Sequence, residues 1–204
     1  MKLKFCGLTR MADIAAANEA RPDYAGFVFA ESRRRVSDLD AARLRARLDP
    51  SIRSVGVFVN DEPAHIAALV RDGVIDLVQL HGDEDARYIA RLRGLTDAPL
   101  IKAVRARTRA DIERAAALPV DFLLLDTYVQ HAYGGSGKPF DWSLIGRPSK
   151  PYFLAGGICQ DNLARALETS AYALDISSGI ETDGVKDAAK MRSIAATVRS
   201  KSNE

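Results

Sequence analysis

Short apolar runs alternate with longer amphipathic segments from one end of the chain to the other. The apolar runs are rich in residues typical of β-strands, and eight of them stand out at residues 3–6, 24–29, 54–59, 77–80, 100–104, 122–125, 152–155 and 173–176. The segments between them repeat apolar positions at helical spacing and predict helices at residues 11–19, 38–48, 63–71, 85–92, 109–117, 161–168 and 187–199. The sixth interval differs, because a glycine-rich segment follows its strand and any helix near residues 142–145 should be brief.

This alternation predicts parallel strands joined by helices. A parallel crossover needs a dozen or more residues, and its helix covers one face of the sheet. Eight strand–helix units are the number that a closed barrel needs, so we expect an α/β fold, a single (β/α)8 barrel (TIM barrel) over residues 1–204. The alternative is an open doubly wound sheet, which is disfavoured because no glycine fingerprint follows the first strand and the spacing stays regular.

Composition and charge narrow the choice of partners. Of the 204 residues, 47% are hydrophobic and 27% charged, as in an ordinary globular protein. Lys and Arg total 29 against 27 Asp and Glu, and the basic residues are scattered, so we expect no nucleic-acid partner. The apolar runs are far shorter than a membrane-spanning helix, so we expect no membrane partner either.

The cysteines and the N-terminal segment predict where the protein works. There are two cysteines, Cys6 and Cys159, and the first residues lack the pattern of a secretory leader, so we expect a cytoplasmic protein. The predicted helices carry no long apolar stripe for a partner chain, which favours a monomer.

Polar residues end several of the predicted strands. In (β/α)8 barrels the reacting groups lie at the carboxyl ends of the strands and on the loops that follow. Cys6 ends the first strand, His81 follows the fourth, Asp126 ends the sixth and Asp175 lies within the eighth. We therefore expect these side chains to face one cavity.

Strand parity adds further candidates, because residues two apart share a face. Lys4 should lie beside Cys6, and Gln79 beside His81. Lys102 also lies within an apolar run, so we expect Lys4 and Lys102 to meet Asp126 and Asp175 around the barrel axis. Unpaired buried charges would cost several kcal/mol, so these groups should pair. The pairing could set the pKa values of catalytic groups, or it could be purely structural.

Each candidate also has an ordinary structural explanation. A cysteine at the end of a strand is often a small core residue, which is also how we interpret Cys159. Asp126 could cap a helix, and His81 could hydrogen-bond to a neighbouring loop.

Two glycine-bearing segments have the placement of a phosphate site. Gly156 and Gly157 follow the seventh strand, and Ser178 and Gly179 follow the eighth, where barrels often bind phosphate through backbone N–H groups. Glycine is also the default turn residue, so neither segment is informative alone. The glycine-rich residues 134–138 do not have P-loop spacing, and we interpret them as a mobile lid rather than a linker.

Several motifs along the chain, taken in order, resemble those of phosphoribosylanthranilate isomerases. They lie at residues 4–9 (KFCGLT), 26–29 (GFVF), 55–60 (VGVFVN), 79–82 (QLHG), 125–127 (LDT), 133–137 (YGGSG), 140–142 (FDW) and 175–181 (DISSGIE). The resemblance covers nearly the whole chain and implies a barrel enzyme of tryptophan biosynthesis. It further implies a small phosphosugar substrate and neither a metal nor an organic cofactor.

The implied reaction is an Amadori rearrangement, an intramolecular conversion of an aminoaldose into an aminoketose. An acid must protonate the ribose ring oxygen to open the ring, and a base must then remove the proton from C2′. By the resemblance, Asp126 is the acid and Cys6 the base. A thiol is a poor base at neutral pH unless positive charge favours the thiolate, and Lys4 is the expected source of that charge.

The resemblance also implies binding roles. An arginine after the second strand should hold the anthranilate carboxylate, and alignment on Ser32 and Val36 assigns it to Arg34, with Arg33 and Arg35 as alternatives. The other expected substrate-binding residues are Lys4, Gln79, His81, Asp175, Gly156, Gly157, Ser178 and Gly179.

Three other functions compete with this one. The histidine-pathway sugar isomerase performs the same chemistry in a similar barrel but normally uses two aspartates, so Cys6 argues against it. Indole-glycerol phosphate synthase has a lysine and glutamate pattern that does not occur at these strand ends. A non-catalytic phosphosugar-binding barrel would need neither the base Cys6 nor the acid Asp126.

Overall fold

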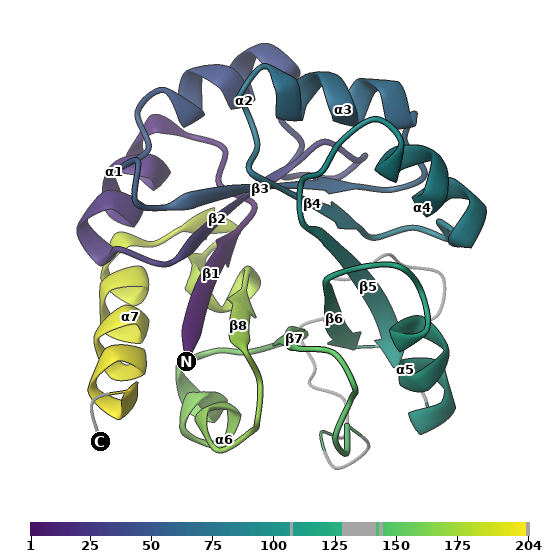
Figure 1. Cartoon of the computed structure of the whole chain (residues 1–204). Helices are drawn as coiled ribbons and strands as arrows, with labels where there is room; N and C mark the ends of the chain where they lie inside the picture. The colour runs from purple at the N-terminus through teal and green to yellow at the C-terminus, as the bar shows by residue number, and fades with distance from the viewer. Residues whose placement is uncertain (107, 128–141, 143–144, 203–204) are drawn as a thin grey trace.

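Eight parallel strands form a closed barrel in which each strand pairs with the next along the chain and the last pairs with the first (Figure 1). This computed structural model describes all residues except 107, 128–141, 143–144 and 203–204. The strands are β1 (Lys2–Cys6), β2 (Tyr24–Val28), β3 (Arg53–Phe58), β4 (Leu77–Leu80), β5 (Leu100–Ala106), β6 (Phe122–Thr127), β7 (Tyr152–Leu154) and β8 (Ala173–Ile176). The predicted (β/α)8 barrel is confirmed.

Helices cover the outside of the barrel. They are α1 (Met11–Ala20), α2 (Asp38–Arg45), α3 (Pro63–Arg71), α4 (Ala86–Arg93), α5 (Arg109–Ala116), α6 (Leu163–Leu167) and α7 (Ala188–Ser202). Polar caps mark where several begin: the side chains of Ser37, Asp85 and Thr108 accept hydrogen bonds from backbone N–H groups of the first turns of α2, α4 and α5. A short hairpin of β9 (Glu181–Thr182) and β10 (Val185–Lys186) precedes α7.

Some boundaries differ from the expectation. Helix α2 ends three residues earlier than the sequence predicts, and α6 is a short helix that follows a 3-10 turn at Gln160–Asn162. The lid expected at residues 134–138 lies outside the described residues. Of the brief helix expected near residues 142–145, only Trp142 and Ile145 are described, and both are buried.

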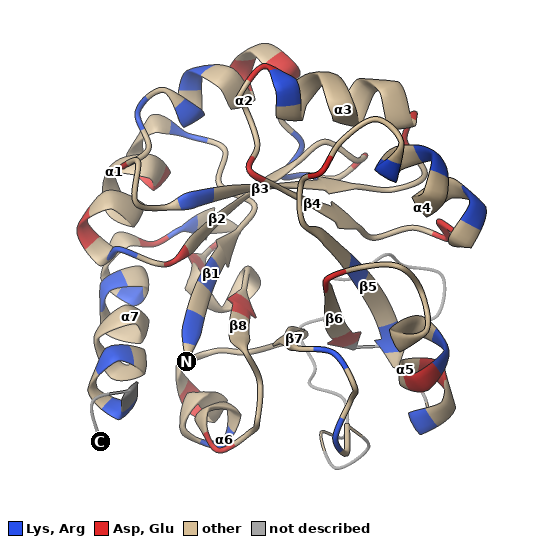
Figure 2. Ribbon diagram, in the orientation of Figure 1, with Lys and Arg blue, Asp and Glu red and all other residues tan. Residues whose placement is uncertain are grey.

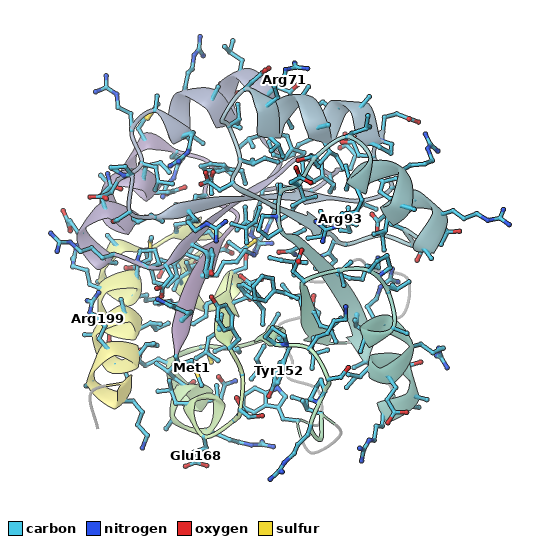
Figure 3. All side chains as sticks on the ribbon, viewed as in Figure 1. Met1, Arg71, Arg93, Tyr152, Glu168 and Arg199 are labelled. Atoms are coloured by element: carbon cyan, nitrogen blue, oxygen red, sulfur yellow. The ribbon has the colours of Figure 1, made fainter. Side chains whose placement is uncertain are left out.

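The barrel has two apolar layers. One lies between the strands and the surrounding helices, and the other fills the interior with alternate side chains of the strands (Figure 3). At the amino-terminal end of the strands, Tyr24, Phe122, Phe153 and Tyr172 pack ring against ring and fill the interior there. This floor leaves the opposite, carboxyl end of the strands as the open end of the barrel.

The first strand and the last helix lie at the closing seam, where β8 pairs with β1 and α7 packs against β1. Helix α7 lies beside α1, on the side of the barrel where β1 begins (Figure 1). No helix in the described part of the chain is long and apolar enough to span a bilayer.

Candidate active site

A cavity of about 480 Å³ opens at the carboxyl ends of the barrel strands. Cys6 from β1, Gln79 and His81 at the end of β4, Asp126 from β6 and Asp175 from β8 all line it. Valine and alanine side chains complete its walls, and the volume lies in the range of pockets that enclose small molecules. The four strand-end side chains that the sequence singled out therefore share one cavity.

Charged groups lie on the strands themselves as well as on the outer helices (Figure 2). Lys4 is fully buried, and its Nζ lies 2.9 Å from Asp175 Oδ1 and 2.9 Å from Gln79 Oε1. Burial lowers the pKa of Lys4, but the negative charges of Asp175 and Cys6 outweigh burial and leave that pKa raised. Lys4 is therefore an ammonium group. It does not itself line the cavity but supports the residues that do.

Cys6 is buried at the cavity wall. Gly26 of β2 makes room for it, because a Cβ at that position would lie 2.8 Å from Cys6 Sγ. Burial raises the pKa of the Cys6 thiol and Asp175 raises it further, whereas Lys4 and Lys186 lower it without reversing the shift. The expected effect of Lys4 on the thiol is thus present, but burial outweighs it.

Asp126 and His81 approach each other across the gap between β4 and β6. His81 Nε2 lies 3.4 Å from Asp126 Oδ2, without the geometry of a hydrogen bond. On its other side, His81 Nδ1 lies 2.8 Å from Gln79 Nε2. Polar contacts therefore run from Asp175 through Lys4, Gln79 and His81 to the vicinity of Asp126.

Of the three consecutive arginines, Arg34 alone lines the cavity. Its Nε and Nη2 donate to the two carboxylate oxygens of Glu181 at 2.7 and 3.0 Å. Arg33 also donates to Glu181, whereas Arg35 pairs with the exposed Glu31. A Cβ at Gly7, whose φ is +76°, would lie 2.4 Å from Arg34 Cδ, so glycine there makes room for the arginine stem.

Glu181 also holds a third cation, the buried Lys186, whose Nζ lies 2.7 Å from Glu181 Oε1. Burial alone would raise the pKa of Glu181, but its hydrogen bonds and ion pairs with Arg34 and Lys186 lower it to about 2. Lys186 Nζ also donates to the carbonyl oxygen of Ser177, and Ser177 Oγ donates to the carbonyl oxygen of Cys6. This cluster joins the arginine to the end of β1.

The cavity rim between β7 and β8 is built from glycine and serine. Gly156 and Gly157 line it with φ values of +85° and +72°, a conformation that favours glycine. Ser178 lines it from the next loop, whereas Gly179 lies behind, where a Cβ would come within 1.9 Å of the carbonyl oxygen of Ile158. Successive backbone N–H groups in such turns form concave anion sites.

The structure corrects one expectation and adds two residues. Lys102 does not face the barrel axis, because Ile101 occupies the interior position of β5 and parity turns Lys102 outward. Its Nζ donates to Glu84 Oε2 at 2.6 Å and to the carbonyl oxygen of Gly82 at 2.7 Å. The sequence analysis gave no role to Glu181, the last residue of the 175–181 motif, or to Lys186, which follows that motif.

Potential metal ligands do not gather in this cavity or elsewhere among the described residues. No group of three or more histidine, cysteine, aspartate or glutamate side chains in that part of the chain is arranged to hold a metal ion.

Comparison with known proteins identifies close relatives over the full length. The family described as N-(5'phosphoribosyl)anthranilate (PRA) isomerase matches residues 3–197. The N-(5'-phosphoribosyl)anthranilate isomerase of Endomicrobium trichonymphae is 48% identical over 200 residues, which cover 98% of each chain. The phosphoribosyl anthranilate isomerase structure from Thermus thermophilus superposes with a TM-score of 0.86 at 33% identity, covering 98% of this chain and 99% of that one.

A third relative was solved with a bound ligand. This phosphoribosyl anthranilate isomerase, in complex with reduced 1-(o-carboxyphenylamino)-1-deoxyribulose 5-phosphate, has a TM-score of 0.83 and 32% identity. The match covers 98% of this chain and 99% of that one.

Proposed function

Since this chain belongs to the N-(5'-phosphoribosyl)anthranilate isomerase family, we propose that Cys6 is the base and Asp126 the acid of its reaction. The reaction is the Amadori rearrangement of N-(5'-phosphoribosyl)anthranilate to 1-(2-carboxyphenylamino)-1-deoxyribulose 5-phosphate in tryptophan biosynthesis. It is an isomerisation of an aminoaldose to an aminoketose by general acid–base catalysis.

The two proton transfers assign the roles. Asp126 gives its proton to the ribose ring oxygen while the C1′–O bond breaks and the nitrogen lone pair forms a C1′=N bond. Cys6, as the thiolate, then removes the proton from C2′, and the electron pair of that C–H bond forms the C1′=C2′ bond of an enolamine. Gain of a proton at C1′ and loss of one from the 2′-hydroxyl complete the aminoketose, so no proton is consumed overall.

The observation that carries this assignment is the shared cavity. Cys6 and Asp126 line it from β1 and β6, two strands that are separated by β7 and β8, so a substrate can lie between the two side chains. The glycine and serine rim of the same cavity offers a place for the phosphate, held mainly by the backbone at Gly156, Gly157 and Ser178.

We assign the anthranilate carboxylate to Arg34. A guanidinium group has two edges that can each hold a carboxylate, and Glu181 occupies the edge formed by Nε and Nη2. We assign the other edge, formed by Nη1 and Nη2, to the substrate carboxylate, because Arg34 lines the cavity. Gly179 shapes the glycine and serine rim by letting the loops after β7 and β8 pack closely. Lys4 and Asp175 form an ion pair in the barrel interior that supports Cys6.

Two further properties stay predictions from the sequence, the monomeric state and the cytoplasmic location. We propose that the chain works as a monomer because its helices carry no long apolar stripe for a partner chain. Sedimentation of the purified protein at assay concentration tests this, and a dimer would contradict it.

The loss of phosphoribosylanthranilate fluorescence tests the proposed function. We expect purified wild-type protein to consume freshly generated substrate without added cofactor, and Cys6→Ala and Asp126→Asn each to lower kcat by about 10²-fold or more with an unchanged circular dichroism spectrum. Glu113→Gln, which changes an exposed carboxylate on α5, serves as the matched control.

Near-wild-type rates in either catalytic variant would refute the assignment of that residue. Turnover of the histidine-pathway phosphoribosyl substrate alone would instead identify the neighbouring Amadori isomerase.

A further inference from the structure

Three polar side chains, those of Lys4, Gln79 and His81, form a hydrogen-bonded chain that ends beside Asp126 at the cavity wall. Lys4 Nζ lies 2.9 Å from Gln79 Oε1, and Gln79 Nε2 lies 2.8 Å from His81 Nδ1. His81 Nε2 then points toward Asp126, 3.4 Å from Oδ2. The chain starts at a buried ammonium group, and this fixes the direction of every bond in it.

Lys4 is the only member that can do nothing but donate. An ammonium group has three N–H donors and no acceptor, so the atom of Gln79 that faces Lys4 must be the amide oxygen. A flipped amide would place an NH2 group against the ammonium, with both groups donating and neither accepting. The Lys4–Asp175 ion pair holds the ammonium in place, so the orientation of Gln79 follows from chemistry and not from a choice between similar atoms.

This orientation sets the state of His81. The amide nitrogen of Gln79 can only donate, so Nδ1 of His81 must accept and cannot carry a proton. An imidazole with a bare Nδ1 is neutral and carries its proton on Nε2. His81 is therefore held as the Nε2–H tautomer, and its one N–H donor points toward Asp126, which lines the cavity with it.

That donor has no partner in the part of the chain that the structure describes. Nε2 of His81 is a buried nitrogen atom without a hydrogen bond to any described residue, although the cost of leaving a buried donor unpaired is about 1–3 kcal/mol. Such a group in a substrate cavity is most simply explained by a bond that forms when substrate is present. The 3.4 Å separation from Asp126 lets both groups reach one oxygen atom.

We propose that His81 is a neutral hydrogen-bond donor to the substrate ring oxygen that Asp126 protonates, and that Gln79 acts as a positioning residue by fixing the tautomer this requires. The proposal rests on the acid role of Asp126 given above. As the C1′–O bond breaks, its electron pair moves to the ring oxygen, which receives the proton from Asp126. His81 transfers no proton. Its N–H bond to the oxygen strengthens as negative charge develops there, which stabilises the transition state more than the ground state.

The tautomer can be measured without substrate. The chain has three histidines, at positions 65, 81 and 131, so 15N NMR of the labelled protein gives few imidazole signals, and loss of one set in His81→Gln assigns it. We expect an unprotonated nitrogen at Nδ1 and a protonated one at Nε2. In Gln79→Glu, a carboxylate faces Nδ1 and should turn it into a protonated nitrogen. A protonated Nδ1 in the wild-type protein would overturn the proposal.

Turnover tests the donor itself. We expect His81→Leu to lower kcat by about 10²-fold with a much smaller change in KM, as when one preorganised donor to a developing oxyanion is removed. His81→Gln carries an amide N–H at a similar reach and should retain clearly more of kcat than His81→Leu. His65→Gln changes a histidine on α3 outside the cavity and is the matched control, expected to keep wild-type kcat.

Equal losses in His81→Leu and His81→Gln, or a wild-type kcat in His81→Leu, would overturn the donor role. These results are distinguishable from failure of the proposed function. In that case Asp126→Asn would remain active, whereas the NMR result would still report the tautomer.

Discussion

Glu181 is the residue whose removal tests most directly how this cavity is held together. It is buried at the start of the β9–β10 hairpin, and its carboxylate accepts hydrogen bonds from Arg33, Arg34 and Lys186 at 2.7–3.0 Å. The substitution Glu181→Gln keeps the size and shape of the side chain and removes its charge. It leaves three cations, Arg33, Arg34 and Lys186, close together without a shared anion.

The size of the effect follows from the pKa of Glu181, which its partners lower from 4.5 to about 2. At about 1.4 kcal/mol per pKa unit, this shift corresponds to about 3 kcal/mol of preference for the charged form in the folded state. Solvent screens the contribution of the largely exposed Arg33, so we expect Glu181→Gln to lower the free energy of unfolding at pH 7 by about 2 kcal/mol.

The pH dependence separates charge from packing. A carboxyl whose folded pKa is lowered contributes stability that is complete above its unfolded pKa and disappears as pH falls through the folded pKa. For Glu181 that window runs from about 4.5 down to about 2. Urea unfolding at pH 7 and at pH 3 should therefore show a smaller difference between wild type and Glu181→Gln at pH 3.

An exposed carboxylate provides the comparison. Glu113 pairs with Arg109 on α5 with both side chains largely exposed, so Glu113→Gln should change stability by about 0.5 kcal/mol or less at pH 7. If Glu181→Gln were equally destabilising at pH 7 and pH 3, or no more destabilising than Glu113→Gln, the reasoning from ion pairing would be refuted.

Three further predictions concern the cavity. Arg34→Ala should raise KM by about tenfold or more, and Arg34→Lys should not restore it, because lysine cannot hold two carboxylates side by side. Unchanged KM values in steady-state kinetics would refute the assignment of the anthranilate carboxylate to Arg34. Burial raises the pKa of Cys6 and Lys186 lowers it, so kcat/KM should rise with pH as the thiolate forms. Lys186→Met should move this rise in kcat/KM to higher pH. An unchanged pH profile of kcat/KM in Lys186→Met would contradict the role of Lys186. Gly26→Ala places a methyl group 2.8 Å from Cys6 Sγ and should lower kcat about ten- to a hundredfold, while the circular dichroism spectrum stays unchanged. A wild-type kcat in this variant would show that Cys6 Sγ can shift freely.

Most of the barrel was predictable because its elements follow local rules. β4 and β8 occupy the residues that the apolar runs predict, and α3 begins at Pro63, an amino acid favoured in the first turn of a helix. α6 was predicted too long because the 3-10 turn at Gln160–Asn162 replaces its first turn, and periodicity does not distinguish the two. The parity that brought Cys6 and Asp126 to one cavity also follows from local rules. Cys6 ends β1 and Asp126 is the last residue but one of β6, and the inward residues of a strand are known once one of them is placed.

The remaining features depend on distances between segments that are far apart in the sequence. Lys102 and Lys4 both lie in apolar runs. Because side chains alternate along a strand, a shift of one position decides whether a lysine points into the barrel, as Lys4 does, or outward, as Lys102 does. Glu181 lies in a two-residue strand, and nothing in its own neighbourhood indicates that it meets Arg34, 147 residues away. The tautomer of His81 depends on Lys4, 75 residues before Gln79, so it could be derived only after the closed barrel had brought β1 and β4 to the same core. Sequence patterns thus identify the groups that can react, whereas charge and protonation state are set by partners that the closed barrel brings together.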